Sequence, residues 1–100
     1  ILPVMTINKE GRAVSEGYVR SLEGGIKRIL RKIEREIDPA KPVDFAVTHV
    51  NNEGDAYALK RALERRFTPR GEIFVLDAAP VLASHTGFGT TAVAYLDDSR

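Results

Sequence analysis

The spacing of apolar residues predicts a long amphipathic helix over residues 21–38. Its apolar positions recur every three or four residues, the period that places side chains on one face of a helix. They are Leu22, Ile26, Ile29, Leu30, Ile33 and Ile37. Ser21 is suited to cap the first turn. Asp38 is expected to end the helix, because a residue that precedes proline avoids the α region. Four of the apolar residues are expected to be buried against a sheet, namely Ile26, Leu30, Ile33 and Ile37.

The opposite face of this helix is charged. It carries Lys27, Arg28, Arg31, Lys32, Glu34, Arg35 and Glu36. Such a face is typical of a helix surface in water with local ion pairs, for example between Lys32 and Glu36. A phosphate-binding patch is the alternative interpretation. If the face is a helix surface in water, Arg28, Arg31 and Arg35 are expected to remain largely in solvent.

A second amphipathic helix is predicted after residue 52. Its buried positions are expected to be Ala56, Leu59, Leu63 and Phe67. Asn52 is a candidate cap, and Glu53 and Asp55 suit the positive N-terminus of a helix. Residues 68–71, Thr-Pro-Arg-Gly, are expected to end it.

Six short apolar runs predict β-strands. They cover residues 3–7, 12–15, 43–50, 72–76, 80–84 and 91–96. The first two are separated by residues 8–11, Asn-Lys-Glu-Gly, in which Gly11 supplies a positive φ for a hairpin turn. Strand 43–50 has apolar residues at odd and even positions, so we expect it to be covered on both faces.

The predicted order of elements is β-β-α-β-α-β-β-β. Hairpins at both ends and a βαβ unit in the middle indicate an α+β domain, in which two helices pack on a mixed β-sheet. The length of 100 residues fits one such domain.

Composition narrows the class of protein. The net charge of +1 argues against a dedicated nucleic-acid binder. The absence of cysteine excludes disulfides, thiolate nucleophiles and zinc ribbons, and fits the cytoplasm. No apolar run in the sequence approaches the roughly 20 residues of a transmembrane helix. Because the chain starts at Ile1 rather than at an initiator Met, we expect it to be a fragment of a longer protein.

The densest chemical signal lies in residues 84–91. Gly87 and Gly89 flank a single residue, which lets the backbone turn tightly and bring N–H groups close to an anion. The imidazole of His85, the hydroxyl of Thr86 and further hydroxyls surround this turn. The segment is therefore suited to hold a carboxylate or a phosphate. A tight turn whose His and Thr satisfy backbone groups is the alternative, and the spacing alone does not decide between them.

Other chemistry-bearing residues carry weaker signals. Ser84 and His85 are adjacent, so on an extended segment they point to opposite faces and do not form a catalytic pair. His49 ends a strand, where it either faces a ligand crevice or is simply a half-buried sheet residue. No carboxylate is spaced to complete a metal site with the two histidines. Arg20 precedes the long helix as a surface arginine or as a contact to an anion or partner.

Taken together, these segments resemble the C-terminal domain of the DegV family of bacterial fatty-acid-binding proteins. The matches follow the family's order across nearly the whole chain. Residues 2–11 resemble its hairpin opening, and residues 18–21, Tyr-Val-Arg-Ser, its segment before the long helix. Residues 45–50, followed by Asn-Asn-Glu, resemble its central strand and second helix. The most specific match is residues 79–89, from Ala-Pro-Val to His-Thr-Gly-Phe-Gly.

The chain departs from the family pattern at two places. Phe88 stands where the family usually has proline, which loosens the turn and adds a bulky ring. Ala79 precedes Pro80 where the family usually has glycine. Neither change removes the residues of the anion cradle, His85, Thr86, Gly87 and Gly89.

The resemblance implies that residues 1–100 are the C-terminal lipid-binding domain of a two-domain protein. A long-chain fatty acid would lie between the domains, with its carboxylate held by hydroxyls of the N-terminal domain and its acyl chain in this one. On this analogy His85 and Thr86 lie by the headgroup with Gly87 and Gly89, and Arg20 lies at the mouth, near the partner or the phosphate.

The resemblance also implies partners and a division of labour. Family members present the bound acid to a separate fatty-acid kinase, so this chain would carry no catalytic residue and no cofactor. Cut from its N-terminal domain, the fragment is expected to self-associate through an apolar face. Three alternatives remain open: another small-molecule carrier on the same fold, part of a kinase-fused member of the superfamily, and an interaction domain without a ligand.

Overall fold

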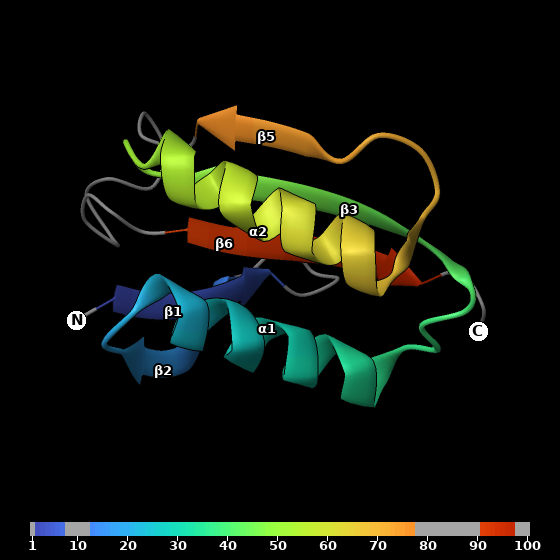
Figure 1. Cartoon of the computed structure of the whole chain (residues 1–100), viewed down its shortest axis with the longest axis horizontal. Helices are drawn as coiled ribbons and strands as arrows, with labels where there is room; N and C mark the ends of the chain where they lie inside the picture. The colour runs from blue at the N-terminus through green and yellow to red at the C-terminus, as the bar shows by residue number, and fades with distance from the viewer. Residues whose placement is uncertain (1, 8–12, 78–90, 98–100) are drawn as a thin grey trace.

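Two helices and six strands make up the part of the chain that the structure describes, residues 2–7, 13–77 and 91–97 of a computed structural model (Figure 1). In chain order they are β1 (Leu2–Ile7), β2 (Ala13–Val19), α1 (Leu22–Glu36), β3 (Pro42–His49), α2 (Glu53–Arg66), β4 (Thr68–Pro69), β5 (Phe74–Asp77) and β6 (Thr91–Asp97). The domain is α+β with a mixed sheet, as the sequence predicts, although one of its strands is not among those predicted.

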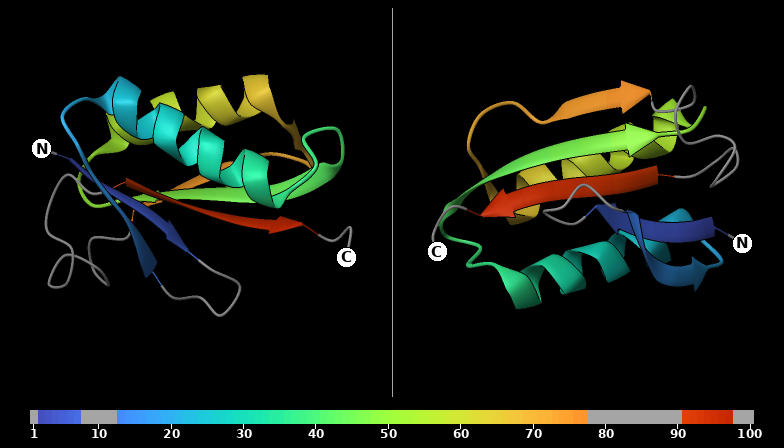
Figure 2. Two further views of the ribbon diagram at one scale, coloured as in Figure 1. Left: turned by 90° about the horizontal axis from the view of Figure 1, so that it is seen from below. Right: turned by 180° about the vertical axis from the view of Figure 1, so that it is seen from behind.

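All six strands join one sheet. Its order is β2-β1-β6-β3-β4, and β5 also pairs with β3, on the side that faces away from β6. The pairs β1–β2 and β3–β6 are antiparallel, whereas β1–β6, β3–β4 and β3–β5 are parallel. The strand that comes last in the chain therefore lies in the middle of the sheet, between β1 and β3 (Figure 2). β3, α2 and β5 form the predicted βαβ unit.

Both helices cover the same face of the sheet (Figure 2). α1 packs on β1 and β2, and α2 packs on β3, β4 and β5. The core between helices and sheet consists of Ile29, Ile33, Ile37, Val43, Phe45, Val47, Ala56, Leu59, Leu63, Phe67 and Ile73. Alternate residues of β3 enter it because side chains of a strand alternate between its faces. The Phe45 and Phe67 rings pack 5.7 Å apart between centroids.

The other face of the sheet is not covered by any described residue. On β3 it carries Ala46 and Thr48, which are half-buried. On β5 it carries Phe74, 60% exposed, and Leu76, 52% exposed, which are in register with Ala46 and Thr48. We call these four residues the open face. Both helices pack on the face that Val43, Phe45 and Val47 present, so the expectation that strand 43–50 is covered on both faces stays a prediction for the open face.

The prediction for α1 is confirmed at both ends. The Gly24 N–H donates to Ser21 Oγ at 3.0 Å, so Ser21 caps the helix. α1 ends at Glu36, ahead of the Asp38-Pro39 stop. The Lys32 ammonium donates to the Glu36 carboxylate at 2.7 Å, as the spacing predicts. Neither α1 nor α2 is long and apolar enough to cross a bilayer.

The buried face of α1 differs from the prediction. Ile33 and Ile37 are buried, but Ile26 and Leu30 are only half-buried, and Ile29 enters the core instead. The apolar stripe is wider than the surface that meets the sheet, and part of it turns toward α2, which lies alongside. The three predicted solvent positions, Arg28, Arg31 and Arg35, are exposed.

The buried face of α2 agrees with the prediction, since Ala56, Leu59, Leu63 and Phe67 are all buried. Asn52 occupies the cap position, but its side chain makes no capping bond to the helix. Residues 68–71 do more than end α2. Thr68 and Pro69 form β4, which pairs with Pro42 and Val43. The N–H of Arg70 then donates to the carbonyl of Val43 at 2.9 Å.

The N-terminal hairpin pairing is confirmed, although β2 extends well beyond the predicted strand 12–15. A bulge interrupts the β1–β2 register between Pro3 and Met5, and Gly17 lies opposite with a φ of 103°. The positive φ favours glycine here, and a Cβ at Gly17 would lie 2.7 Å from Nη1 of Arg28, so the end of that flexible side chain would have to move. The predicted turn at 8–11 and strand at 80–84 lie outside the described residues.

Candidate functional site

One end of the sheet collects most of the polar candidates. β3 and β5 end there and β6 begins there, because His49 is in register with Asp77 on one side and Thr91 on the other. Ligands of open α/β sheets commonly bind beyond the carboxyl ends of parallel strands. Asp77 and Thr91 are also the described residues that border segment 78–90 in the sequence, which contains the predicted anion cradle.

Both helices begin at this same end of the sheet (Figure 1). α1 starts directly after Arg20-Ser21, and α2 starts after Asn52. A helix N-terminus carries partial positive charge and free N–H groups, which favour an anion nearby. Acidic residues in the first turns, Glu23 in α1 and Glu53 and Asp55 in α2, offset part of that charge.

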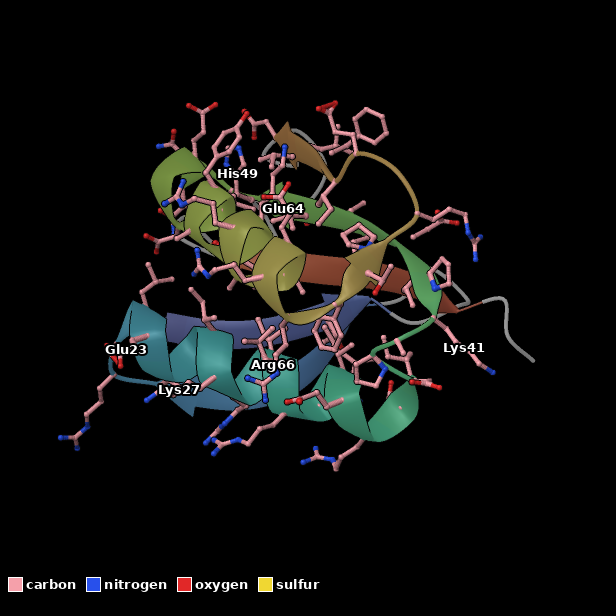
Figure 3. All side chains as sticks on the ribbon, turned by 45° about the vertical axis from the view of Figure 1, so that its right-hand side comes forward. Glu23, Lys27, Lys41, His49, Glu64 and Arg66 are labelled. Atoms are coloured by element: carbon pink, nitrogen blue, oxygen red, sulfur yellow. The ribbon has the colours of Figure 1, made fainter. Side chains whose placement is uncertain are left out.

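His49 is held at this end by a backbone hydrogen bond. It is 6% exposed, and the N–H of Asn52 donates to its Nδ1 at 3.0 Å. Because Nδ1 accepts this bond, a neutral ring carries its proton on Nε2. No described residue is recorded as a hydrogen-bond partner of Nε2. Figure 3 shows His49 beside the first turns of α2, with Lys41 at the opposite end of the sheet.

The turn after His49 is tied to β6 by the side chain of Asn52. Its Nδ2 donates to Oδ2 of Asp55 at 2.8 Å and to Oγ1 of Thr91 at 3.5 Å. Asn51 completes the turn with a φ of 54°, a conformation that asparagine tolerates better than most residues. Asn52 therefore joins β3, α2 and β6.

Arg20 lies at the same end of the sheet. It follows Val19, the last residue of β2, which pairs with Leu2, and β1 separates β2 from β6. Two strand spacings, about 10 Å, therefore separate the strand that precedes Arg20 from the strand that begins at Thr91. The side chain of Arg20 is exposed, and no ion pair joins it to a described residue.

The predicted site residues thus divide into two groups. Arg20 is described and lies at this end of the sheet. His85, Thr86, Gly87 and Gly89 lie outside the described residues, and their role in binding stays a prediction. The structure adds His49, Asn52 and Thr91, which lie together at this end of the sheet. In the sequence they are indicated only by a histidine at the carboxyl end of a strand, with Asn51 and Asn52 close behind it.

Metal binding finds no support in the described part of the chain. Residues 2–7, 13–77 and 91–97 contain no cluster of three or more His, Asp and Glu side chains that could hold an ion. Together, Arg20, His49 and the two helix N-termini place groups that favour an anion at one end of the sheet.

Comparison with known proteins identifies the family. The model described as "Uncharacterised protein, DegV family" matches residues 1–98, so the chain belongs to the DegV family. A DegV domain-containing protein of Clostridium perfringens is 24% identical over 100 residues. A DegV domain-containing protein of Streptococcus pyogenes is 25% identical over 93 residues, which are 93% of this chain and 31% of that protein.

Two solved structures share the fold. A DegV family protein from Corynebacterium glutamicum superposes with a TM-score of 0.72 at 23% identity, over 90% of this chain and 34% of that one. A protein described as a fatty acid binding DegV family protein, from Streptococcus agalactiae, superposes with a TM-score of 0.64 at 25% identity, over 93% of this chain and 31% of that one. The alignment with the Clostridium perfringens relative covers 100% of this chain but only 34% of that relative, so the chain spans about a third of the relative's length.

Proposed function

We propose that this chain binds a long-chain fatty acid together with a separate N-terminal domain, and that the carboxylate is presented to a fatty-acid kinase. The observation that carries the proposal is the gathering of anion-binding groups at one end of the sheet. Arg20, His49 and the two helix N-termini lie at that end, where segment 78–90 is joined to β5 and β6. The Streptococcus agalactiae neighbour, described as fatty acid binding, supports the class of ligand.

The headgroup belongs at this polar end. His85 and Thr86 would donate to the carboxylate from segment 78–90, with the backbone of Gly87 and Gly89 approaching closely. Arg20 would lie at the mouth, where its planar fork suits a carboxylate or the phosphate that a kinase adds. In this arrangement the chain binds and orients the acid, and the chemistry belongs to the kinase.

The open face is the surface that a second domain or the acyl chain would cover. Phe74 and Leu76 are large apolar residues more than half exposed, and they lie together on an edge strand. The hydroxyl of Thr48, in register with Leu76, is buried without a hydrogen-bond partner among the described residues. Clustered apolar side chains on a protein surface commonly mark a binding surface.

Native mass spectrometry of the full-length protein after gentle extraction tests the proposal. We expect a co-purified mass that equals a long-chain fatty acid and that is lost after delipidation. A bound mass of another chemical class would instead favour a different carrier on the same fold. A clean apo mass, together with no uptake of added oleate, would contradict fatty-acid binding.

A further inference from the structure

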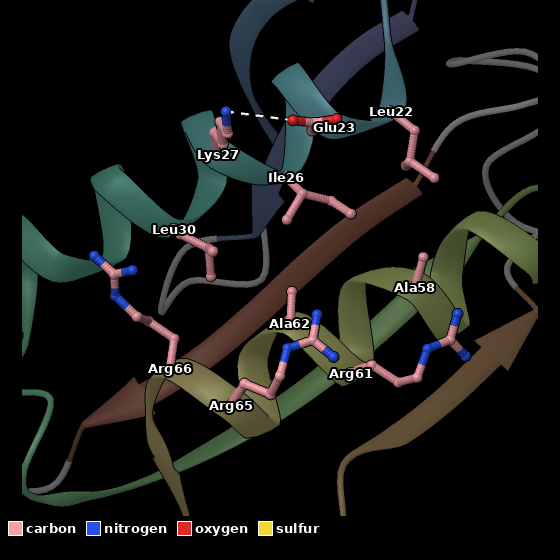
Figure 4. Close-up of a pocket in the computed structure, with 10 residues that line it drawn as sticks. All are labelled: Leu22, Glu23, Ile26, Lys27, Leu30, Ala58, Arg61, Ala62, Arg65 and Arg66. Carbon is pink, nitrogen blue, oxygen red and sulfur yellow. Dashed lines mark ion pairs between the residues drawn. The ribbon is translucent and has the colours of Figure 1, made fainter.

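A groove runs between α1 and α2 on the helix side of the molecule (Figure 4). Its volume is about 490 Å³. Its apolar residues come from both helices and are Leu22, Ile26, Leu30, Ala58 and Ala62. Ala62 is buried and the other four are half-buried, so the apolar surface is recessed between the helices.

The charged residues of the groove are mostly cations. Lys27 on α1 and Arg61, Arg65 and Arg66 on α2 line it, against the single carboxylate of Glu23. Two of the four cations have acidic partners. Nζ of Lys27 lies 3.4 Å from Glu23, and Nη2 of Arg66 lies 2.7 Å from Glu34. The groove therefore has a positive rim.

Arg61 and Arg65 make no ion pair or hydrogen bond with any described residue. They lie one turn apart on α2, a spacing at which like charges are unfavourable. Arg65 in the last turn suits the negative end of the helix dipole, but Arg61 lies too far from that end to benefit. Their arrangement is explained if an anionic group lies across both side chains.

The residues on the walls of the groove leave room for a third helix. A helix packs between two others when small side chains let it approach to about 8–10 Å between axes. Ala58 and Ala62, one turn apart, provide small side chains along the α2 wall. A third helix could place its apolar stripe on Ile26 and Leu30, and its flanking acidic residues beside the two arginines. This is the helix-in-groove mode of recognition.

We propose that the α1–α2 groove docks an amphipathic helix of a partner protein, whose apolar stripe is flanked by Asp and Glu. An anionic membrane surface fits less well, because membrane binding requires apolar side chains that protrude, and those of the groove are recessed. The proposal does not depend on fatty-acid binding. The groove is lined by the two helices. Figure 2 shows both helices on one face of the sheet, and the open face is the other one.

The test uses a labelled synthetic peptide of the same length as α1, with a leucine stripe flanked by glutamates. We expect it to bind the protein in fluorescence anisotropy. A peptide with lysine at each glutamate position should bind at least about tenfold more weakly. The double variant Arg61→Glu/Arg65→Glu should weaken binding of the acidic peptide by at least about tenfold, because like charges then face each other.

Arg31→Glu/Arg35→Glu is the matched control. These two arginines are exposed, lie one turn apart on α1 and do not line the groove, so the charge change and its spacing are the same. At physiological salt, screening should limit the effect of this control to about twofold. Ala58→Gln fills the groove without changing charge and should also weaken the acidic peptide, while circular dichroism stays unchanged.

Three results would overturn the proposal. One is no binding of the acidic peptide. Another is an equal loss in the two double variants, which would mean unspecific attraction. The third is binding to phosphatidylglycerol vesicles that depends on Arg61 and Arg65 when the peptide does not bind, which would assign the surface to a membrane. If native mass spectra show no bound fatty acid and the acidic peptide still binds, only the fatty-acid proposal is contradicted.

Discussion

The two faces of the sheet are built from the same strands, yet they meet different surroundings. On β3, Val43, Phe45 and Val47 point under the two helices and are almost fully buried. Between them, Asp44 is exposed, and Ala46 and Thr48 are half-buried on the open face. At the first three positions the helix side of the strand is wholly apolar, whereas the open side mixes Ala46 with the charged Asp44 and the polar Thr48, and described residues cover only the helix side. The comparison teaches that burial in this sheet depends on which face the two helices cover, and not on the strand alone.

The largest expected effect is loss of packing on the helix side. Leu63 is fully buried, so Leu63→Ala should lower the free energy of unfolding by about 2–5 kcal/mol. Leu76→Ala on the open face removes the same atoms from a side chain that is 52% exposed, and should cost less than about 1 kcal/mol. Urea unfolding of the two variants measures the difference. Equal losses would mean that the faces do not differ as described.

The next effect separates the polar end of the sheet from the apolar surface. If segment 78–90 holds the carboxylate, His85→Ala in the full-length protein removes a hydrogen bond to a charged group, worth roughly 1.5–3 kcal/mol. Affinity for a fatty acid should then fall about 10- to 150-fold. Affinity for the matching fatty alcohol should change much less, and the melting temperature should stay the same.

The comparison of fatty acid with fatty alcohol serves as the control for His85→Ala, because the two ligands share the apolar tail and differ in the charged headgroup. Equal weakening of acid and alcohol, or a lower melting temperature, would assign His85 a structural role. His49→Gln provides a second comparison, because His49 is bonded to the N–H of Asn52 and is part of the fold. We expect that variant to lower the melting temperature.

A third effect concerns the uncovered face. The 100-residue chain alone should self-associate through Phe74 and Leu76, since both are exposed and apolar. Leu76→Lys should weaken a dimer by about 1 kcal/mol for each copy, roughly 30-fold in Kd. Sedimentation equilibrium and ANS fluorescence measure this. A strict monomer at high concentration without ANS binding would show that the open face needs no cover.

The smallest effect compares the starts of the two helices. Ser21→Ala removes the acceptor for the Gly24 N–H and should cost about 1 kcal/mol. At the cap of α2 the side chain of Asn52 bonds to Asp55 and Thr91 instead. Asn52→Ser therefore places a good cap residue at this position but should lose the bonds to Asp55 and Thr91. Thermal melts of both variants test this, and a Ser21→Ala melt equal to wild type would contradict the cap.

The residues whose environment is set locally could be predicted from the sequence. The stripe of α2, the Ser21 cap and the Lys32–Glu36 pair depend on helical spacing alone, and the structure confirms them. The partial burial of Ile26 and Leu30 could not be predicted, since it depends on where α2 lies beside α1. β4 was missed because its two residues form a strand only through pairing with β3.

The site follows the same division. The place of Arg20 follows from its position before a capped helix, and its exposure follows from its charge. The link from Asn52 to Thr91 joins residues far apart in the sequence, so no local pattern indicates it. Likewise, the bond from Asn52 to His49 requires the turn at Asn51, which spacing alone does not specify.

The central place of β6 has a consequence for how the chain folds. β1, β2 and α1 form one local unit, and β3, α2, β4 and β5 form another. The sheet becomes continuous only when β6 pairs with β1 and β3 at the same time. On a ribosome, that step waits for residues 91–97, after both units have been synthesised. Contacts so distant in sequence raise the contact order and slow folding, because the loop-closure entropy is lost before they form. A chain truncated before Thr91 should therefore accumulate as two collapsed halves with an unpaired edge on each, a state prone to aggregation.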